Sequence, residues 1–164
     1  MTNKASTPKF QSPQAAQWCF TYNQLKPNAF AKRLQLLKSL LQIENNAWLE
    51  PQFQCSLGTN ILLGNNVYAN HNVTIEDLYP VNIGKHVLIG PHTLISTLPS
   101  SNNAQDGSPI TLCDNVWVGA HVYIGPGVTI GEGAVIGAGS YVTESVPALT
   151  LAAGNPCRVI RAIQ

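Results

Sequence analysis

Charged residues are scarce in this chain of 164 amino acids, and their distribution is uneven. Asp, Glu, Lys and Arg make up 10% of the sequence, well below the ~25% of an average soluble domain, so we expect self-association to cover much of the surface. Residues 1–38 contain six of the nine basic residues and no acidic one, whereas residues 39–157 contain one lysine and all eight acidic residues. None of the 13 glycines precedes Gly58. The chain is therefore expected to consist of two differently built parts.

Long apolar runs and paired cysteines are also missing. No run approaches the length of about 18 apolar residues that could span a bilayer. The polar first residues, MTNKASTPKFQSPQAAQ, lack the apolar core that a secretion signal needs. The four cysteines form no CxxC pair, which argues against a disulfide framework. We expect a reduced, cytoplasmic protein that does not contact the membrane.

A repeat of six residues organises most of the chain. Aliphatic residues recur at every sixth position over 61–96, with one slip of two, and again over 110–148. The residues of this series are Leu63, Ala69, Ile75, Ile83, Ile89, Ile95, Leu112, Val118, Ile124, Ile130, Ile136, Val142 and Ala148. A helix has 3.6 residues per turn and a strand has a period of two, so neither alone matches this spacing.

A period of six is typical of a parallel β-helix. Each hexad supplies one short strand and one corner, and the series residue and the fourth residue after it point into the core. Glycine follows the series residue at seven places, which suits a strained corner. Three hexads close a triangular coil of about eighteen residues, and about four stacked coils share one continuous core. The predicted fold is therefore mainly β.

The other segments flank or interrupt this β-helix. Residues 1–20 are polar and contain proline, so we expect a flexible basic arm, and residues 21–57 are expected to be an N-terminal helical segment. The β-helix spans 58–153, and turn-forming residues over 97–109 predict one extruded loop. Residues 154–164 form a C-terminal tail.

A helix of about four turns is expected before the coils. The apolar residues of NAFAKRLQLLKSLLQI recur with helical spacing, so one face of the helix is apolar, whereas Arg33 falls off that face. The apolar residues are Phe30, Leu34, Leu37 and Leu41. We expect this face to pack on the first coil.

Several stretches outside and inside the repeat resemble one family. ENNAWLEPQF, GNNVYANHNVTIED, VNIGKHVLIGP and AAGNPCRVIRAI are similar to stretches of the bacterial galactoside and maltose O-acetyltransferases, which are left-handed parallel β-helix acyltransferases with hexapeptide repeats. The resemblance covers residues 20–163. It implies a left-handed β-helix, a homotrimer, acetyl-CoA as co-substrate, and direct acetyl transfer to a hydroxyl of a small, sugar-like acceptor at a site between subunits.

The resemblance also assigns a groove for CoA. Trp117 matches the family tryptophan that lines the groove, and Ala138 and Thr143 match residues that contact the pantetheine arm. Arg158 and Arg161 match basic residues near the nucleotide phosphates, where guanidinium groups suit phosphate oxygens.

The acceptor side departs from the family pattern. Asn70 matches an asparagine that the family places at the acceptor. The family's acidic residue downstream corresponds to Leu78, although a small realignment would replace it by Glu76 or Asp77. The acidic residue that relatives use near the N-terminus has no counterpart within residues 1–38. The sequence therefore leaves the acceptor unidentified.

The general base is missing from its expected place. Relatives carry a histidine in a His-Pro context in the extruded loop, and residues 97–109 contain none. By hexad counting, His71, His92 and His121 fall at one corner of three successive coils. Three interpretations are open: polar corner residues without a role, a substitute base supplied by His71 or His92, or a metal site between subunits.

The sequence therefore supports an acetyl-CoA-dependent O-acetyltransferase as the leading hypothesis. The alternative is a catalytically impaired relative that keeps the trimer and the CoA groove and serves as a binding or assembly protein. No metal cofactor is expected. The basic residues of the arm have no interleaved aromatic repeats, so no nucleic-acid partner is expected.

Overall fold

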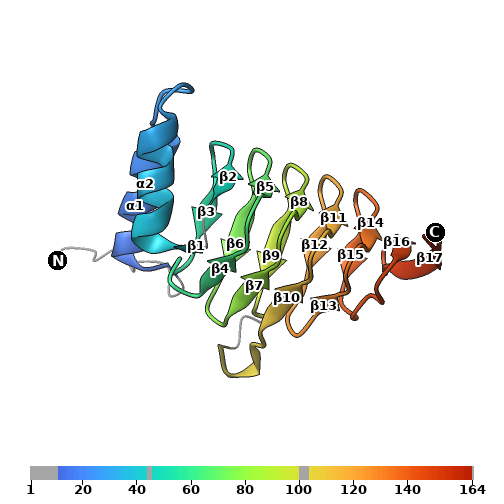
Figure 1. The fold of residues 1–164 in the computed structure, drawn as a ribbon. Helices are drawn as coiled ribbons and strands as arrows, with labels where there is room; N and C mark the ends of the chain where they lie inside the picture. Colours follow the sequence, from blue (N-terminus) through green and yellow to red (C-terminus); the bar gives the residue numbers. More distant parts are fainter. Residues whose placement is uncertain (1–10, 44–45, 100–103, 164) are drawn as a thin grey trace.

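The computed structural model describes residues 11–43, 46–99 and 104–163. Two helices, α1 (Pro13–Asn23) and α2 (Phe30–Leu40), stand at one end of a solenoid of short strands, and the coils follow one another in chain order towards the C-terminus (Figure 1). Within the described residues, neither helix has the length or the apolar character needed to cross a membrane.

The strands form the three faces of the solenoid. The first sheet contains β1 (Gln42–Ile43), β4 (Ile61–Leu63), β7 (Val81–Ile83), β10 (Ile110–Leu112) and β13 (Thr129–Ile130). The second sheet contains β2 (Ala47–Leu49), β5 (Val67–Ala69), β8 (Leu88–Ile89), β11 (Trp117–Val118), β14 (Val135–Ile136), β16 (Thr150–Ala153) and β17 (Arg158–Ala162). The third sheet contains β3 (Gln54–Cys55), β6 (Thr74–Glu76), β9 (Leu94–Ser96), β12 (Tyr123–Ile124) and β15 (Tyr141–Val142). We call the corner between the second and third sheets the second corner, and that between the third and first sheets the third corner.

Strand pairing fixes the length of each coil. Thr111 pairs in parallel with Thr129, eighteen positions later, as the hexad count predicts. Leu62 pairs with both Gln42 and Asn82, so the earlier coils contain twenty residues each. Asn82 pairs with Thr111 across a longer connection that includes the segment 97–109. The described residues thus form five coils of three strands, one more than the repeat count indicated.

The core consists of the residues that the sixfold series predicts. Every member of the series from Leu63 to Val142 is buried, and so is the fourth residue after each, except after Ile75 and Ile95, where the partly exposed Tyr79 and Pro99 stand at the third corner. Ala148 is the exception and is exposed, because the chain after β15 does not complete a further coil. β16 still joins the second sheet through β14, and β17 then turns back and pairs antiparallel with β16.

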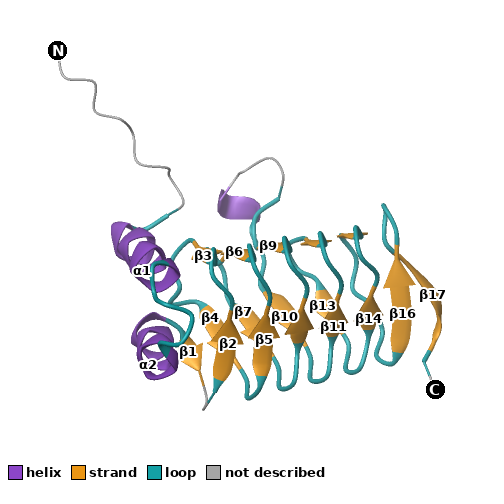
Figure 2. Cartoon of the chain, turned by 90° about the horizontal axis from the view of Figure 1, so that it is seen from above, coloured by secondary structure: helices purple, strands orange, loops and turns teal. Residues whose placement is uncertain are grey.

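The solenoid begins earlier than the sequence indicated. β1, β2 and β3 form the three sides of a first coil, although the segment 21–57 was expected to be helical. Ile43, Leu49 and Cys55 continue the sixfold series with the same slip of two before Leu63, but no glycine follows them to mark the repeat. Both helices pack on this coil and cover the N-terminal end of the core (Figure 2).

Helix α1 corrects the expectation of a flexible arm over 1–20. The Ser12 hydroxyl accepts a hydrogen bond from the Ala15 amide at 3.0 Å and caps the helix, and Pro13 occupies its first turn. Trp18 and Tyr22 are buried, and the Tyr22 hydroxyl donates to the Leu49 carbonyl at 2.6 Å. The apolar residues that recur along this helix secure it to the first coil. Residues 1–10 of the predicted arm lie outside the described part of the chain.

The predicted apolar face of helix α2 is buried at Leu37 and Leu41 but not at its first residue, Phe30. Phe30 is 63% exposed and packs against the outer side of Trp48, with ring centroids 5.4 Å apart. Arg33 is buried instead, and its guanidinium lies over the Tyr22 and Trp48 rings at 5.3 and 5.6 Å. Attraction between the cation and the ring faces offsets part of the cost of burying this charge.

The segment 97–109 leaves the solenoid at the third corner and contains one short 3-10 turn, Ala104–Asp106 (Figure 2). Its base is closed, because the Ser108 amide donates to the Thr97 carbonyl at 2.9 Å. The Thr97 hydroxyl donates to the Glu76 carbonyl at 2.7 Å, and Leu98 is buried. The loop therefore starts from a fixed position on the scaffold.

Candidate functional site

A groove of about 420 Å³ runs along the second corner, parallel to the stack of coils. Its floor is a column of three glycines, Gly90, Gly119 and Gly137, one from each of three successive coils. Pro91, Ala120 and Ala138 line it on the side towards the third sheet. Trp117 and Val135 line it on the side of the second sheet.

The glycine floor is imposed by how closely the coils stack. A Cβ on Gly90 would lie 2.5 Å from the carbonyl carbon of Gly119, and a Cβ on Gly119 would lie 2.6 Å from the Ala138 nitrogen. Neither position has room for a larger residue, because the neighbouring atoms belong to the backbone. The same constraint leaves this column without side chains over three coils and so creates the floor of the groove.

Asn70 stands at one end of this groove, in the same column as the glycines. Its amide donates to the Ile89 carbonyl at 2.9 Å, as the Gly90 amide donates to Val118 in the next coil. Its side-chain Oδ1 accepts a hydrogen bond from the His71 amide at 2.8 Å. Among the described residues the Asn70 Nδ2 has no partner, so two N–H donors are available at the end of the groove.

One coil before Asn70, Glu50 occupies the same column. Its amide donates to the Ala69 carbonyl at 2.8 Å. Its Oε1 accepts hydrogen bonds from Trp48 Nε1 at 3.0 Å and from the Tyr68 hydroxyl at 3.3 Å. Burial, and then the Glu50 charge, raise the pKa of Tyr68 above its ordinary value. The sequence analysis missed this acid, although Glu50 and Asn70 are separated by one coil length of twenty residues.

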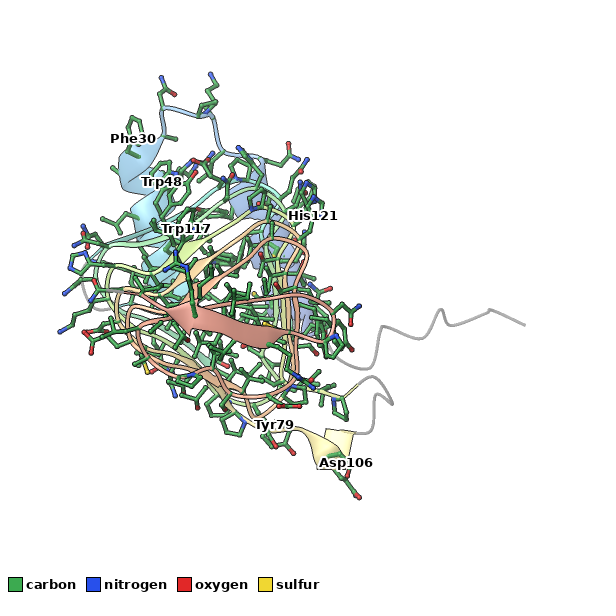
Figure 3. All side chains as sticks on the ribbon, turned by 90° about the vertical axis from the view of Figure 1, so that its right-hand side faces the viewer. Phe30, Trp48, Tyr79, Asp106, Trp117 and His121 are labelled. Carbon is green, nitrogen blue, oxygen red and sulfur yellow. The ribbon has the colours of Figure 1, made fainter. Side chains whose placement is uncertain are left out.

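Trp117 lies on the outer face of the second sheet and is 56% exposed. It pairs with Leu88 on one side and Val135 on the other, so its indole lies in a row of outward side chains that begins at Trp48. Figure 3 shows Trp48 and Trp117 on the same side of the solenoid. The structure thus brings together three predicted site residues, Asn70, Trp117 and Ala138, in one groove.

The other predicted CoA contacts lie apart from the groove of the same chain. Thr143 follows β15 and is exposed at the third corner. Arg158 and Arg161 lie on β17, at the edge of the sheet that carries Trp117. Arg158 pairs with Glu144 at 3.3 Å, and both side chains are exposed. Arg161 donates to the Ala162 carbonyl at 3.1 Å.

The three corner histidines do not form a single ladder, which corrects the hexad count. His92 and His121 stack in parallel, with ring centroids 4.7 Å apart, and both have the positive φ that Asn72 has one coil earlier. His71 is one position out of this register, because it is the second residue after Ala69 of the series, whereas His92 and His121 are the third after Ile89 and Val118. It is instead equivalent to Pro91 and Ala120, since the amides of His92 and His121 donate to the carbonyls of His71 and Pro91 respectively.

Comparison with known proteins places this geometry in a family. Residues 109–144 match the profile of the family described as Bacterial transferase hexapeptide (six repeats). The chain is 45% identical over 152 residues to galactoside O-acetyltransferase of Escherichia coli K12, which covers 88% of this chain and 75% of that protein. The chain belongs to the hexapeptide-repeat acetyltransferases. The resemblance stated from the sequence motifs is thereby confirmed.

Solved structures of acetyltransferases share the whole fold. Galactoside acetyltransferase in complex with coenzyme A superposes with a TM-score of 0.86 at 43% identity, over 92% of this chain and 80% of that one. Maltose O-acetyltransferase from Clostridium difficile 630 superposes with a TM-score of 0.85 at 34% identity, over 92% and 85% of the two chains. The mainly β prediction of stacked hexapeptide coils is therefore confirmed.

Asp77 is not available as an acceptor-binding acid in this acetyltransferase. Its carboxylate is buried and accepts hydrogen bonds from the backbone amides of Ser56, Leu57 and Asn60, at 3.0, 2.8 and 3.3 Å. Burial raises the pKa of this carboxyl above its ordinary value, and the backbone amides oppose the shift. Asp77 fixes the turn after the first coil, so the realignment that would give it a role at the acceptor does not hold.

The described residues contain no group of three or more His, Cys, Asp and Glu side chains placed to hold a metal ion. The four cysteines are free thiols. Cys19 of α1 and Cys55 of β3 lie in contact, with their sulfur atoms 3.7 Å apart, and this contact and then burial raise the pKa of Cys55. Neither cysteine lines the groove, whereas Asn70 does, with His71 directly after it and Glu50 one coil before it.

Proposed function

We propose that this protein is an acetyl-CoA-dependent O-acetyltransferase that transfers the acetyl group directly to a hydroxyl of a small, sugar-like acceptor. The observation that carries the proposal is the glycine-floored groove, which runs past Trp117 and Ala138 and ends at Asn70. It occurs in a chain 43% identical to an acetyltransferase solved with coenzyme A.

In this proposal the groove holds the extended arm of CoA. The open floor leaves space for a narrow chain, and the exposed Trp117 ring supplies an apolar wall. Arg158 and Arg161 lie on β17, at the edge of the sheet that contains Trp117, where their guanidinium groups can pair with the nucleotide phosphates. The thioester then lies towards Asn70, and Asn70 Nδ2 donates a hydrogen bond to the acceptor.

The place of Thr143 supports the proposed homotrimer. This residue is exposed at the third corner, away from the groove of its own chain. Its predicted contact with the pantetheine arm therefore requires a neighbouring subunit that presents its third corner to the groove. The extruded loop leaves from the same corner and would approach the same site. We place this trimer in the reduced cytoplasm, in keeping with four free cysteines.

For the general base, His71 is better placed than His92. His71 is exposed and occupies the register position that Pro91 and Ala120 hold in the groove wall, directly after Asn70. The His92 ring is stacked on His121 one position further on. In the proposed step, His71 removes the acceptor proton as the hydroxyl oxygen attacks the thioester carbonyl. The C–S bond then breaks, and the imidazolium returns the proton to the CoA thiolate.

The alternative, a catalytically impaired relative that only binds CoA, gains no support from the comparisons, because the relatives described above are named as transferases. Both hypotheses predict CoA binding, and only the first predicts turnover. The deciding measurement is release of free thiol from acetyl-CoA, with methyl β-galactoside, maltose and glucose as acceptors, beside a calorimetric titration with CoA. Thiol release above the acceptor-free rate supports the transferase. Tight CoA binding without any acceptor-dependent release would favour the impaired relative.

A further inference from the structure

One coil beyond the end of the groove at Asn70 lies a carboxylate to which none of the family motifs gave a role. Along the second corner, Glu50 and Asn70 are the only polar members of a column that continues with Gly90, Gly119 and Gly137. Adjacent parallel strands lie about 4.8 Å apart, so Glu50 is the next side chain beyond Asn70 on the line of the groove. The sugar-binding acids expected from relatives are missing, yet an acid stands at this place.

The Glu50 side chain is held in one orientation. Trp48 and Tyr68 both donate to its Oε1, and both rings lie on the outer face of the second sheet. Trp48 is itself packed between Phe30 and the buried Arg33. Oε1 receives both of these hydrogen bonds. The second carboxylate oxygen has no hydrogen-bond partner among the described residues.

We infer that the free oxygen of Glu50 accepts a hydrogen bond from a hydroxyl of the acceptor other than the one that is acetylated. Asn70 supplies N–H donors and Glu50 supplies a charged acceptor, and a polyol satisfies both because each hydroxyl can donate and accept. A charged acceptor makes hydrogen bonds about twice as strong as a neutral one. Glu50 therefore selects acceptors with at least two neighbouring hydroxyls, such as sugars, over simple alcohols. This inference rests on the proposed transferase function.

The test is the variant Glu50→Gln. Glutamine keeps the shape of the side chain, and its Oε1 can still accept from Trp48 and Tyr68, so the fold is retained. We expect the acceptor KM to rise about tenfold in the thiol-release assay with methyl β-galactoside, while the KM for acetyl-CoA stays unchanged. With ethylene glycol monomethyl ether, which has one hydroxyl, the variant and the wild type should react equally.

The control is Glu132→Gln, which removes an exposed carboxylate at the corner between the first and second sheets, away from the groove. It should alter neither KM. Equal acceptor KM values for Glu50→Gln and the wild type would overturn the inference alone. A loss of thermal stability with parallel loss of both substrates would show that Glu50 is only structural. A wild type without acceptor-dependent thiol release would overturn the proposed function and this inference together.

Discussion

Gly90 lies so close to Gly119 of the next coil that a Cβ at position 90 would be 2.5 Å from the Gly119 carbonyl carbon. The stacking of coils at the second corner depends on this contact, because backbone atoms cannot rotate away as a side chain can. The groove is thus a direct result of coil packing.

The variant Gly90→Ala tests this dependence. We expect it to lower the free energy of unfolding by about 3 kcal/mol, since the methyl group forces two backbones apart. Gly139→Ala is the matched control: no atom lies within 4 Å of a Cβ there, so only its φ of +70° costs stability, by about 1 kcal/mol. Denaturant unfolding at one protein concentration compares the two. Equal losses would contradict the packing account.

Trp117→Ala should weaken CoA binding. The indole is 56% exposed in the free chain, so its burial against a bound arm would contribute the free energy of a large apolar contact. We expect the dissociation constant for CoA to rise roughly ten- to hundredfold in calorimetric titration. Leu62→Ala, which alters an exposed leucine of the first sheet, serves as control and should leave it unchanged. An unaltered affinity in Trp117→Ala would place CoA elsewhere.

His71→Gln should lower kcat by about 10²–10⁴, because loss of a general base removes that much of the rate. The affinity for CoA should not change, since the substituted side chain acts on the acceptor proton. His86→Gln is the control, because His86 lies at a different corner, where it faces Asn66. If His92→Gln removes the activity and His71→Gln retains it, the general base is His92, in the stacked pair with His121, and not His71.

The buried carboxyl of Asp77 should make the stability of the fold depend on pH. Its pKa in the folded protein is raised above the ordinary value of 3.8, mainly by burial. The folded state therefore binds this proton more tightly than the unfolded chain does, and the associated stability is lost as the pH rises above 3.8 through the folded pKa. Relative to Asp77→Asn, the wild type should lose stability with rising pH. Measurement of the unfolding free energies of both proteins between pH 4 and pH 8 checks this. A wild type that gains stability relative to Asp77→Asn as the pH rises would refute it.

The sequence predicted the interior better than the ends. The series from Leu63 to Val142 placed the core correctly, because one position in every hexad must be buried and is therefore aliphatic in each repeat. The first coil escaped notice because no glycine follows its series positions Ile43, Leu49 and Cys55. Helix α1 escaped because polar residues surround Trp18 and Tyr22, although their helical spacing was visible.

The candidate site was predicted in part for a related reason. Asn70, Trp117 and Ala138 lie in motifs whose register is regular, and the structure places all three along one groove. Glu50 lies in the first coil, where no glycine marks the repeat, and His71 is the second residue after its series residue, whereas His92 and His121 are the third. Thr143 lies at a different corner, so no single chain can show what it contacts.

The two ends of the solenoid also explain how such a stack of strands stays finite. A β-solenoid resembles a short length of fibril, in which each terminal coil exposes unpaired amides and carbonyls to a further chain. Here α1 and α2 pack on the first coil, and at the other end β17 runs antiparallel to β16 in the second sheet. A chain arriving in the direction of the coils finds no parallel template at that edge of the second sheet. Loss of β17 would thus turn a self-limited protein into one prone to end-to-end polymerisation.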